Sequence, residues 1–431
     1  MFEKILRDQK KEIQELFLSN QIIPRQLQVP LERGIAIIIM GVRRSGKSTF
    51  AHQLLHSSIS NDIDNSNKEI KYGYINFDDE RLGDLGTDGF QEILAAVHSI
   101  YGKVSTLLLD EPQNQPKWEM FVNRLLRRKY TILITGSNSS LLSSELSTHL
   151  TGRFLRYDLF PFSFQEYLTL KQFDFQGYSD EQIGTIMHHL KDYLDSGGFP
   201  EVFKYHDAPR YLRDLFNSIL MKDIVYRYRI HKPNELEKIA YYFLSTPASY
   251  YTYSRLAGSL GMNKNLIATY LDYLEKAYLF FSLSIYSKRY KTQHRSPRKI
   301  YSVDLGLNAK IGFRTESNIT RQIENLVFLE LKRRSIQYER PFEIYYWKSP
   351  EQYEVDFVIK FGTKITQLIQ VCYMINSDKI RNREEKGLLK ANEELECEKM
   401  LLITWDEEQI VKRKEKSIEY IPLWKWLLNN N

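Results

Sequence analysis

Residues 41–48 constrain the fold of this 431-residue chain more than any other segment, because they read Gly-Val-Arg-Arg-Ser-Gly-Lys-Ser. This G-x-x-x-x-G-K-S pattern follows the apolar run 35–40, which reads as a buried strand, and precedes residues 49–55, which suit a helix. Glycines let the backbone N–H groups of such a loop converge on a phosphate, where a lysine ammonium joins them. A surface loop can match the pattern by chance, but the strand and the helix around it favour an ATP or GTP site.

Each residue type in the loop has an expected task. Lys47 is expected to meet the β- and γ-phosphates, and the Ser48 hydroxyl is expected to be a Mg²⁺ ligand. The predicted nucleotide-binding residues are Gly41, Arg43, Arg44, Ser45, Gly46, Lys47, Ser48 and Thr49.

A second apolar run, residues 106–109, leads into two acidic residues, Asp110 and Glu111. In a nucleotide site of this kind Asp110 holds the Mg²⁺ shell, and Glu111, displaced by one residue, polarises the attacking water as general base. The pair predicts hydrolysis as well as binding. The alternative is a core strand that ends in an acidic turn before Pro112.

Two further residues are catalytic candidates. Asn138 follows the predicted strand 130–135 and is expected to sense the γ-phosphate, with Ser137 as the second choice. Arg153 precedes the strand-like run 154–159 and can act as an arginine finger, either in its own site or in that of a neighbouring subunit. A surface salt bridge is the competing interpretation for Arg153.

These motifs, together with Leu159-Phe-Pro-Phe-Ser-Phe-Gln-Glu166 and Gly197-Gly-Phe-Pro-Glu201, occur in a familiar order. In this respect the chain resembles a large prokaryotic family of AAA-type ATPases. Members carry a winged-helix segment and a C-terminal domain of unknown function with a restriction-endonuclease-like fold. The resemblance covers most of the chain and implies an α/β P-loop core with a parallel sheet, ATP and Mg²⁺ as ligands, and ATP hydrolysis.

Length and composition agree with several domains, since 431 residues exceed what one core usually organises. The apolar runs are too short for a membrane span, the N-terminus lacks a signal-peptide core, and two cysteines suit a reducing compartment, so we expect a cytoplasmic protein without membrane contact. The predicted domains are residues 1–170 (N-terminal helix and ATPase core), 171–235 (helical lid), 236–299 (winged helix and basic linker) and 300–431 (nuclease-like).

Residues 236–287 fit a winged helix, with helices predicted over 237–244, 253–260 and 264–276 and wing strands over 279–286. We expect Ser254 to cap the second helix. The third helix would offer Asn263, Lys264 and Asn265 to a DNA major groove, although such modules also pack against proteins.

A basic run follows the predicted wing strands. Residues 287–299 contain no acidic residue, and a net charge of +6 permits nucleic-acid binding without requiring it. The alternative is a solvated basic loop. The candidate phosphate contacts are Lys288, Arg289, Lys291 and Arg295, and the run also includes Arg298 and Lys299.

The C-terminal third predicts a helix over 320–334 and strands over 344–347, 353–359 and 365–371. By its resemblance to the endonuclease-like core, Glu324 and Asp356 would be metal-site carboxylates. Where Glu-x-Lys is expected, the chain has Gln370 and Cys372, so one ligand becomes an amide and the lysine is lost. We expect a degenerate nuclease site in a fold kept for binding or assembly.

The sequence thus predicts a Mg²⁺-dependent AAA-type ATPase that binds or remodels DNA as a homo-oligomer, such as a hexamer. One alternative is a nucleotide-dependent signalling or defence switch whose C-terminal domains bind a protein partner. A second alternative is an ATP-regulated metal nuclease.

Overall fold

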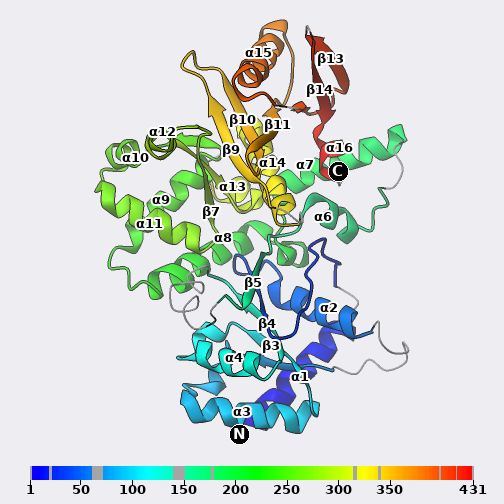
Figure 1. Cartoon of the computed structure of the whole chain (residues 1–431), viewed down its shortest axis with the longest axis vertical. Coiled ribbons are helices and arrows are strands. Elements are labelled where there is room, and N and C mark those ends of the chain that lie inside the picture. The colour runs from blue at the N-terminus through cyan, green and yellow to red at the C-terminus, as the bar shows by residue number, and fades with distance from the viewer. Residues whose placement is uncertain are drawn as a thin grey trace. The chain divides into compact units, whose positions relative to one another are not determined.

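The computed structural model describes residues 2–18, 22–60, 71–138, 150, 152–175, 179–313, 318–337, 341–397, 399–413 and 415–429. The chain forms two compact units (Figure 1). The first unit consists of residues 1–160 and 276–278, and the second of residues 161–275 and 279–431. The domain boundaries expected from the sequence stay predictions.

The first unit is built on a five-stranded sheet in which every neighbouring pair is parallel. A parallel sheet is buried on both faces, which explains why its strands are nearly continuous apolar runs. Every residue of β4 and β1, two of the three inner strands, is buried. In spatial order the strands are β2 (Gly73–Asn76), β3 (Thr106–Asp110), β4 (Thr131–Gly136), β1 (Ala36–Met40) and β5 (Phe154–Asp158).

Helices surround this sheet, as the blue and cyan part of Figure 1 shows. They are α1 (Phe2–Leu18), α2 (Lys47–Ser60), α3 (Gly86–Tyr101), α4 (Trp118–Arg127) and the short turns η1 (Glu80–Leu82) and η2 (Pro112–Asn114). Because the strands are parallel, their carboxyl ends meet at one edge of the sheet, with Met40 opposite Gly136 and Asp110 opposite Thr135. The α/β P-loop fold expected from the sequence is confirmed.

Helix α1 packs against the edge strand β2, and one of its side chains, Gln9, makes the backbone hydrogen bonds that a neighbouring strand would make. Gln9, 1% exposed, accepts a hydrogen bond from the Asn76 backbone N–H at 3.0 Å and donates one to the Asn76 carbonyl at 3.2 Å. The amide therefore satisfies both backbone groups of one residue at the edge of the sheet.

The second unit begins with helices. Its α7 starts after Ser179, whose side chain accepts from the Gln182 N–H, and ends before Gly197. The elements are α6 (Phe164–Leu170), α7 (Asp180–Ser196), η4 (Pro200–Lys204), α8 (Ala208–Ser218) and η5 (Ile219–Tyr226), a π-helical stretch that continues α8.

The next part of the second unit combines three longer helices, here called the three-helix group, with a short fourth helix and a small antiparallel sheet in the order β6-β8-β7. The prediction that Ser254 caps the second helix was wrong, because Ser254 lies inside the first turn and the extended residue before the helix is Thr252, which accepts from the Arg255 N–H. The basic run, expected to be a linker, contains a short helix. The elements are α9 (Pro233–Ser245), β6 (Ser249–Tyr251), α10 (Tyr253–Leu260), α11 (Lys264–Lys276), β7 (Phe280–Leu283), α12 (Tyr290–Arg295) and β8 (Arg298–Ser302).

A six-stranded mixed sheet in the order β13-β14-β12-β11-β10-β9 forms the C-terminal part. Helix α14 contacts β8, β9 and β11, and α15 contacts β10, β11 and β12, so each helix covers part of the sheet. The elements are α13 (Leu305–Lys310), α14 (Asn318–Gln337), β9 (Glu343–Lys348), β10 (Glu354–Phe361), β11 (Lys364–Val371), α15 (Asp378–Leu395), β12 (Lys399–Thr404), β13 (Gln409–Arg413), β14 (Lys416–Pro422) and α16 (Leu423–Leu428).

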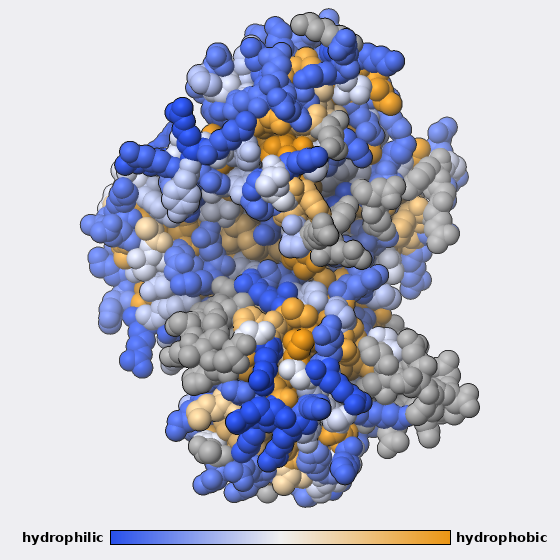
Figure 2. Space-filling model, viewed as in Figure 1, coloured by the Kyte–Doolittle hydropathy of each residue, from blue (hydrophilic) through white to orange (hydrophobic). Residues whose placement is uncertain are grey.

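Hydrophilic residues cover much of the outer surface on the face shown in Figure 2. Among the helices that the structure describes, none has the length and apolar character needed to cross a bilayer.

Candidate functional site

The loop between β1 and α2 is shaped by close packing at its first residue. A Cβ atom on Gly41 would lie 2.2 Å from the Leu159 carbonyl oxygen, so only glycine allows β1 to enter the loop there. Gly46, with φ of +90°, and Arg44, with φ of +65°, complete the turn into the helix. The loop therefore has a fixed, tightly folded path at the carboxyl edge of the sheet.

This loop presents donors suited to an anion. Lys47 is 6% exposed, and its ammonium donates to the Val42 carbonyl at 3.0 Å, which folds the side chain back over the loop. The buried Ser45 hydroxyl has no hydrogen-bond partner in the part of the chain that the structure describes. Helix α2 starts at Lys47, so its first N–H groups, which have no partner inside a helix, lie at the positive end of the helix dipole. These features fit a phosphate group.

Asp110 at the end of β3 is held by three hydroxyl groups. Ser48 donates to Asp110 Oδ1 at 3.0 Å, the Thr135 hydroxyl donates to the same oxygen, and Tyr74 donates to Oδ2 at 3.2 Å. Burial and the Asp110 charge raise the pKa of Tyr74 well above its usual value, so the phenol stays a donor. A serine hydroxyl beside a carboxylate is a donor set that suits Mg²⁺.

Thr135 and Tyr74 were not singled out from the sequence. Both lie within buried strands and carry no motif, and only the pairing of β2, β3 and β4 brings their hydroxyls to Asp110.

Glu111 leaves the strand in a direction different from that of Asp110. Its backbone is left-handed, with φ of +50°, which is rare for a residue that is not glycine. Its Oε2 atom accepts from the Ser137 N–H and hydroxyl, both at 3.2 Å, and also from the Gln113 amide. The carboxylate thus faces the end of β4, where Asn138 is fully buried.

Arg25 also contacts the loop and carries no motif that would have revealed it. Its guanidinium donates to the Ser45 carbonyl at 3.0 Å and to the Phe160 carbonyl at 2.5 Å. Arg25 therefore ties the loop to the residue that follows β5 by two positions.

Arg153 lies at the other edge of the sheet. Its carbonyl accepts from the Ala36 N–H at 2.9 Å, at the start of β1, and the side chain is exposed. Strand β1 spans five residues, so roughly 15 Å of strand separates Arg153 from the loop at the far end.

The residues expected to contact DNA are exposed. Asn263, Lys264 and Asn265 lie at the start of α11, where Asn263 Oδ1 accepts from the Asn265 N–H at 2.8 Å and so acts as a helix cap. The four candidate phosphate contacts gather on and just before α12, between β7 and β8; they are Lys288, Arg289, Lys291 and Arg295.

Lys299 does not belong to that exposed basic surface, and its inclusion in the run was wrong. It is 2% exposed, and its ammonium meets Glu324 Oε1 at 2.8 Å, Glu354 Oε1 at 2.6 Å and Asp356 Oδ1 at 2.7 Å. The sequence predicts that this site lacks a lysine, because Cys372 stands at the expected position. The structure shows that Lys299, which comes from a strand distant in sequence, lies at the carboxylates instead. Glu354 could have been found, since it precedes Asp356 by two residues and so shares a face of β10.

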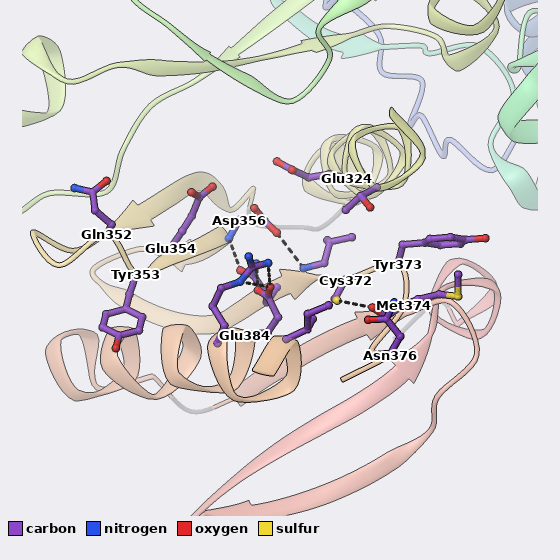
Figure 3. Close-up of a pocket in the computed structure, with 15 residues that line it drawn as sticks. Glu324, Gln352, Tyr353, Glu354, Asp356, Cys372, Tyr373, Met374, Asn376 and Glu384 are labelled. Carbon is purple, nitrogen blue, oxygen red and sulfur yellow. Dashed lines mark hydrogen bonds and ion pairs between the residues drawn. The ribbon is translucent and has the colours of Figure 1, made fainter. Parts of the chain in front are cut away.

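Gln370 binds the same group of residues. Its Oε1 accepts from the Asp356 N–H at 3.1 Å, and its Nε2 donates to Glu384 Oε2 at 2.8 Å. A cavity of about 560 Å³ adjoins the carboxylates. Figure 3 shows Glu324 on α14 above β10 and Glu384 on α15 below it.

Comparison with known protein families agrees with the P-loop fold of the first unit. A family model described as an AAA domain matches residues 33–168. With the parallel sheet and the Gly41–Ser48 loop, this match identifies residues 33–168 as a P-loop domain of the AAA class. Two further family models, both of domains of unknown function, match residues 187–317 (DUF8612) and residues 321–426 (DUF4143).

The chain belongs to the same family as the uncharacterized protein MJ1544 of Methanocaldococcus jannaschii. The two are 34% identical over 444 aligned residues, which cover 99% of this chain and 95% of the relative. An uncharacterized protein of Haemophilus influenzae is 28% identical over 403 residues, or 91% of this chain and 94% of that one.

A solved structure gives a weaker match. Cdc6p from Pyrobaculum aerophilum aligns over 71% of this chain and 92% of its own, with 17% identity and a TM-score of 0.27, which is too low to carry an argument. The winged-helix and endonuclease-like assignments stay predictions.

Proposed function

We propose that this protein hydrolyses ATP with Mg²⁺ at the edge of the first sheet. The observation that carries the proposal is the 3.0 Å contact between Ser48 and Asp110 beside the buried Lys47, with Glu111 held one residue further along. The residues provide a cation, a metal-ligand pair and a separate carboxylate, which are the parts that phosphoryl transfer to water needs.

In this proposal Lys47 and the N–H groups of the loop hold the phosphates, and Ser48 and Asp110 hold the metal ion. Mg²⁺ would neutralise charge on the phosphate oxygens. The neighbouring hydroxyls of Thr135 and Tyr74 fix the Asp110 carboxylate, so it does not have to be ordered when the ion binds.

Glu111 is the proposed general base. Its two hydrogen bonds with Ser137, both 3.2 Å long, hold the carboxylate beside the end of β4. Asn138, the residue after Ser137, is the proposed γ-phosphate sensor. The left-handed backbone at Glu111 supports a functional role, because such strain persists where the surroundings hold it in place.

Arg153 is proposed to serve the ATP site of a neighbouring subunit. Its place at the amino edge of the sheet, opposite its own loop, supports action in trans over action in cis. The active form would then be a homo-oligomer, such as a hexamer.

Two variants and a control test the ATPase proposal. Lys47→Ala should lose tight ATP binding, because the phosphates lose the ammonium. Glu111→Gln should bind ATP but hydrolyse it at least about a hundredfold more slowly, because only the base is lost. Glu92→Gln, an exposed change on α3, is the matched control and should keep both properties. Equal loss of binding in Lys47→Ala and Glu111→Gln would contradict the role of Glu111.

We also propose that the second unit binds DNA through a winged helix. The order helix, strand, helix, helix and two strands, with the small sheet arranged β6-β8-β7, supports this fold, and the exposed basic residues lie between its last two strands. The runner-up is a switch whose second unit binds a protein partner, and it would show ATPase rates indifferent to DNA.

The C-terminal sheet is proposed to be endonuclease-like but without cleavage activity. Gln370 in place of a carboxylate supports the loss of activity. ATP-regulated metal cleavage remains the competing function.

A further inference from the structure

The carboxylates of the C-terminal sheet surround a cation that belongs to the chain itself. Lys299 Nζ has three protons, and three carboxylates lie within 2.8 Å of it: Glu324, Glu354 and Asp356. The ring of Tyr250 lies 5.3 Å away and covers the ammonium further. Each donor of the buried lysine therefore has a carboxyl oxygen as its acceptor.

The three carboxylates and the lysine come from different parts of the second unit. Lys299 is in β8, the middle strand of the small sheet, whereas Glu354 and Asp356 are in β10 and Glu324 is in α14. Other contacts near the cluster join the same elements, since Tyr301 of β8 donates to Glu324 Oε1 at 2.7 Å and its ring stacks on Phe328 at 4.0 Å.

Such a cluster needs a cation. Carboxylates this close repel one another, and burial adds to the cost of their charge, so an uncompensated group would lower the stability of the fold. Divalent cations usually supply the compensation in carboxylate clusters. Here an ammonium is already in place.

We infer that Lys299 is a built-in counter-cation that takes the place of a divalent metal ion in this centre and latches β8 to β10 and α14. The centre is then closed to metal while the lysine is in place, and the three-helix group and the C-terminal sheet are joined through it. This inference does not depend on ATP hydrolysis in the first unit.

Two features point to a divalent cation as the ion that the ammonium replaces. The cavity of about 560 Å³ is lined by all three carboxylates and gives an ion access to them. Their oxygens already converge on one point at 2.6–2.8 Å, somewhat longer than the distances that a metal requires, so a small contraction would suffice.

The test uses the full chain without nucleotide, with inorganic Mn²⁺ as the added ion. Lys299→Met removes the charge and keeps the length of the side chain. Lys360→Met is the matched control, because Lys360 lies in β10, the strand of Glu354 and Asp356, and forms an ion pair with Glu343 near the surface. Free Mn²⁺ is measured by electron paramagnetic resonance and melting by calorimetry.

Lys299→Met should bind one Mn²⁺ more than the wild type. In chelator it should melt about 10 °C lower, because a broken buried ion cluster is strongly destabilising, and Mn²⁺ should restore at least half of that loss. Lys360→Met should show neither change. Equal Mn²⁺ binding in the wild type and Lys299→Met would overturn the inference.

A second variant covers the case in which Lys299→Met does not fold. Lys299→Met/Glu354→Gln/Asp356→Asn removes two negative charges together with the positive one, so it should fold, melt above Lys299→Met and bind no extra Mn²⁺. Failure of this variant to fold, or a lower melting temperature than that of Lys299→Met, would refute the latch. Mn²⁺-dependent DNA cleavage by the wild type that is lost in Lys299→Met would do the same, because the lysine would then be catalytic.

Discussion

Each of the two units contains a buried lysine, and the two lysines differ in the groups that their ammonium ions contact. Lys47 donates to a neutral carbonyl of its own loop, whereas Lys299 meets three carboxylates. The first arrangement places a positive charge on a loop suited to an anion, and the second uses the charge to neutralise carboxylates of the protein itself. A lysine that belongs to no motif therefore says little about function until the partner of its ammonium is known.

The difference extends to what each centre needs from outside. The first is built around loop donors and a serine–aspartate pair that suit ATP and Mg²⁺, and in our proposal a second copy of the chain completes it. The second contains its own cation. Three predictions test this contrast, beginning with the largest effect.

The first prediction concerns completion of the ATP centre by another subunit. Arg153→Ala and Glu111→Gln should each be at least about a hundredfold slower than the wild type. An equimolar mixture should recover activity, because the sites of Arg153→Ala subunits keep Glu111 and receive Arg153 from a Glu111→Gln neighbour. The measurement is the ATPase rate of the mixture against the sum of the separate rates. Absence of recovery despite proven subunit exchange would remove Arg153 from catalysis in trans.

The second prediction contrasts the exposed basic residues with the buried Lys299. Replacing Lys288, Arg289 and Lys291 with alanine should weaken DNA binding and reduce its salt dependence by up to about three log units per log unit of salt, because fewer counterions are released. Binding isotherms at several salt concentrations give this slope.

The control for that measurement replaces Lys379, Lys386 and Lys390, three exposed lysines of α15, with alanine. It should leave the slope unchanged. Wild-type affinity that does not vary with salt would favour the protein-binding switch.

The third and smallest effect is a difference in pH response between the units. Burial lowers the pKa of His52 in the first unit to about 3, so unfolding gains protons as pH falls below 6.5 and this unit loses stability. Burial raises the pKa of Asp304 in the second unit to about 6, and burial with the Asp356 charge raises that of Glu324 to about 8. These carboxyls favour the folded state more as pH falls, so the second unit gains stability.

Calorimetry between pH 6.5 and 4.5 should therefore move the two melting transitions in opposite directions by a few degrees. His52→Gln, which cannot titrate, should flatten the response of the first unit only. Parallel shifts of both transitions would show that other groups dominate.

The residues that could be predicted from the sequence share one property: each is recognised by the residues next to it along the chain. The Gly41–Ser48 loop and the Asp110-Glu111 pair each follow an apolar run, and strand ends in a parallel sheet meet, so their convergence could be predicted. Helix α11 begins and ends where its pattern predicted, at Lys264 and Lys276. These are local signals.

The residues that sequence reasoning missed depend on pairing between distant segments. Thr135 and Tyr74 reach Asp110 only because β4 and β2 flank β3, and Lys299 reaches Asp356 across 57 positions in sequence. Periodicity within a strand shows which face a residue occupies but not which strand lies opposite. The basic run therefore looked uniform, although one of its members is buried.

The pairing of Gln9 with the edge strand has a practical consequence. The AAA match begins at residue 33, and a fragment cut to that boundary would lack α1 altogether. Strand β2 would then present its backbone N–H and C=O groups to water, where another copy of the fragment can add a strand to the sheet. A truncated ATPase core is thus expected to aggregate and to be poorly soluble. Fragments intended for biochemical work should keep the first helix.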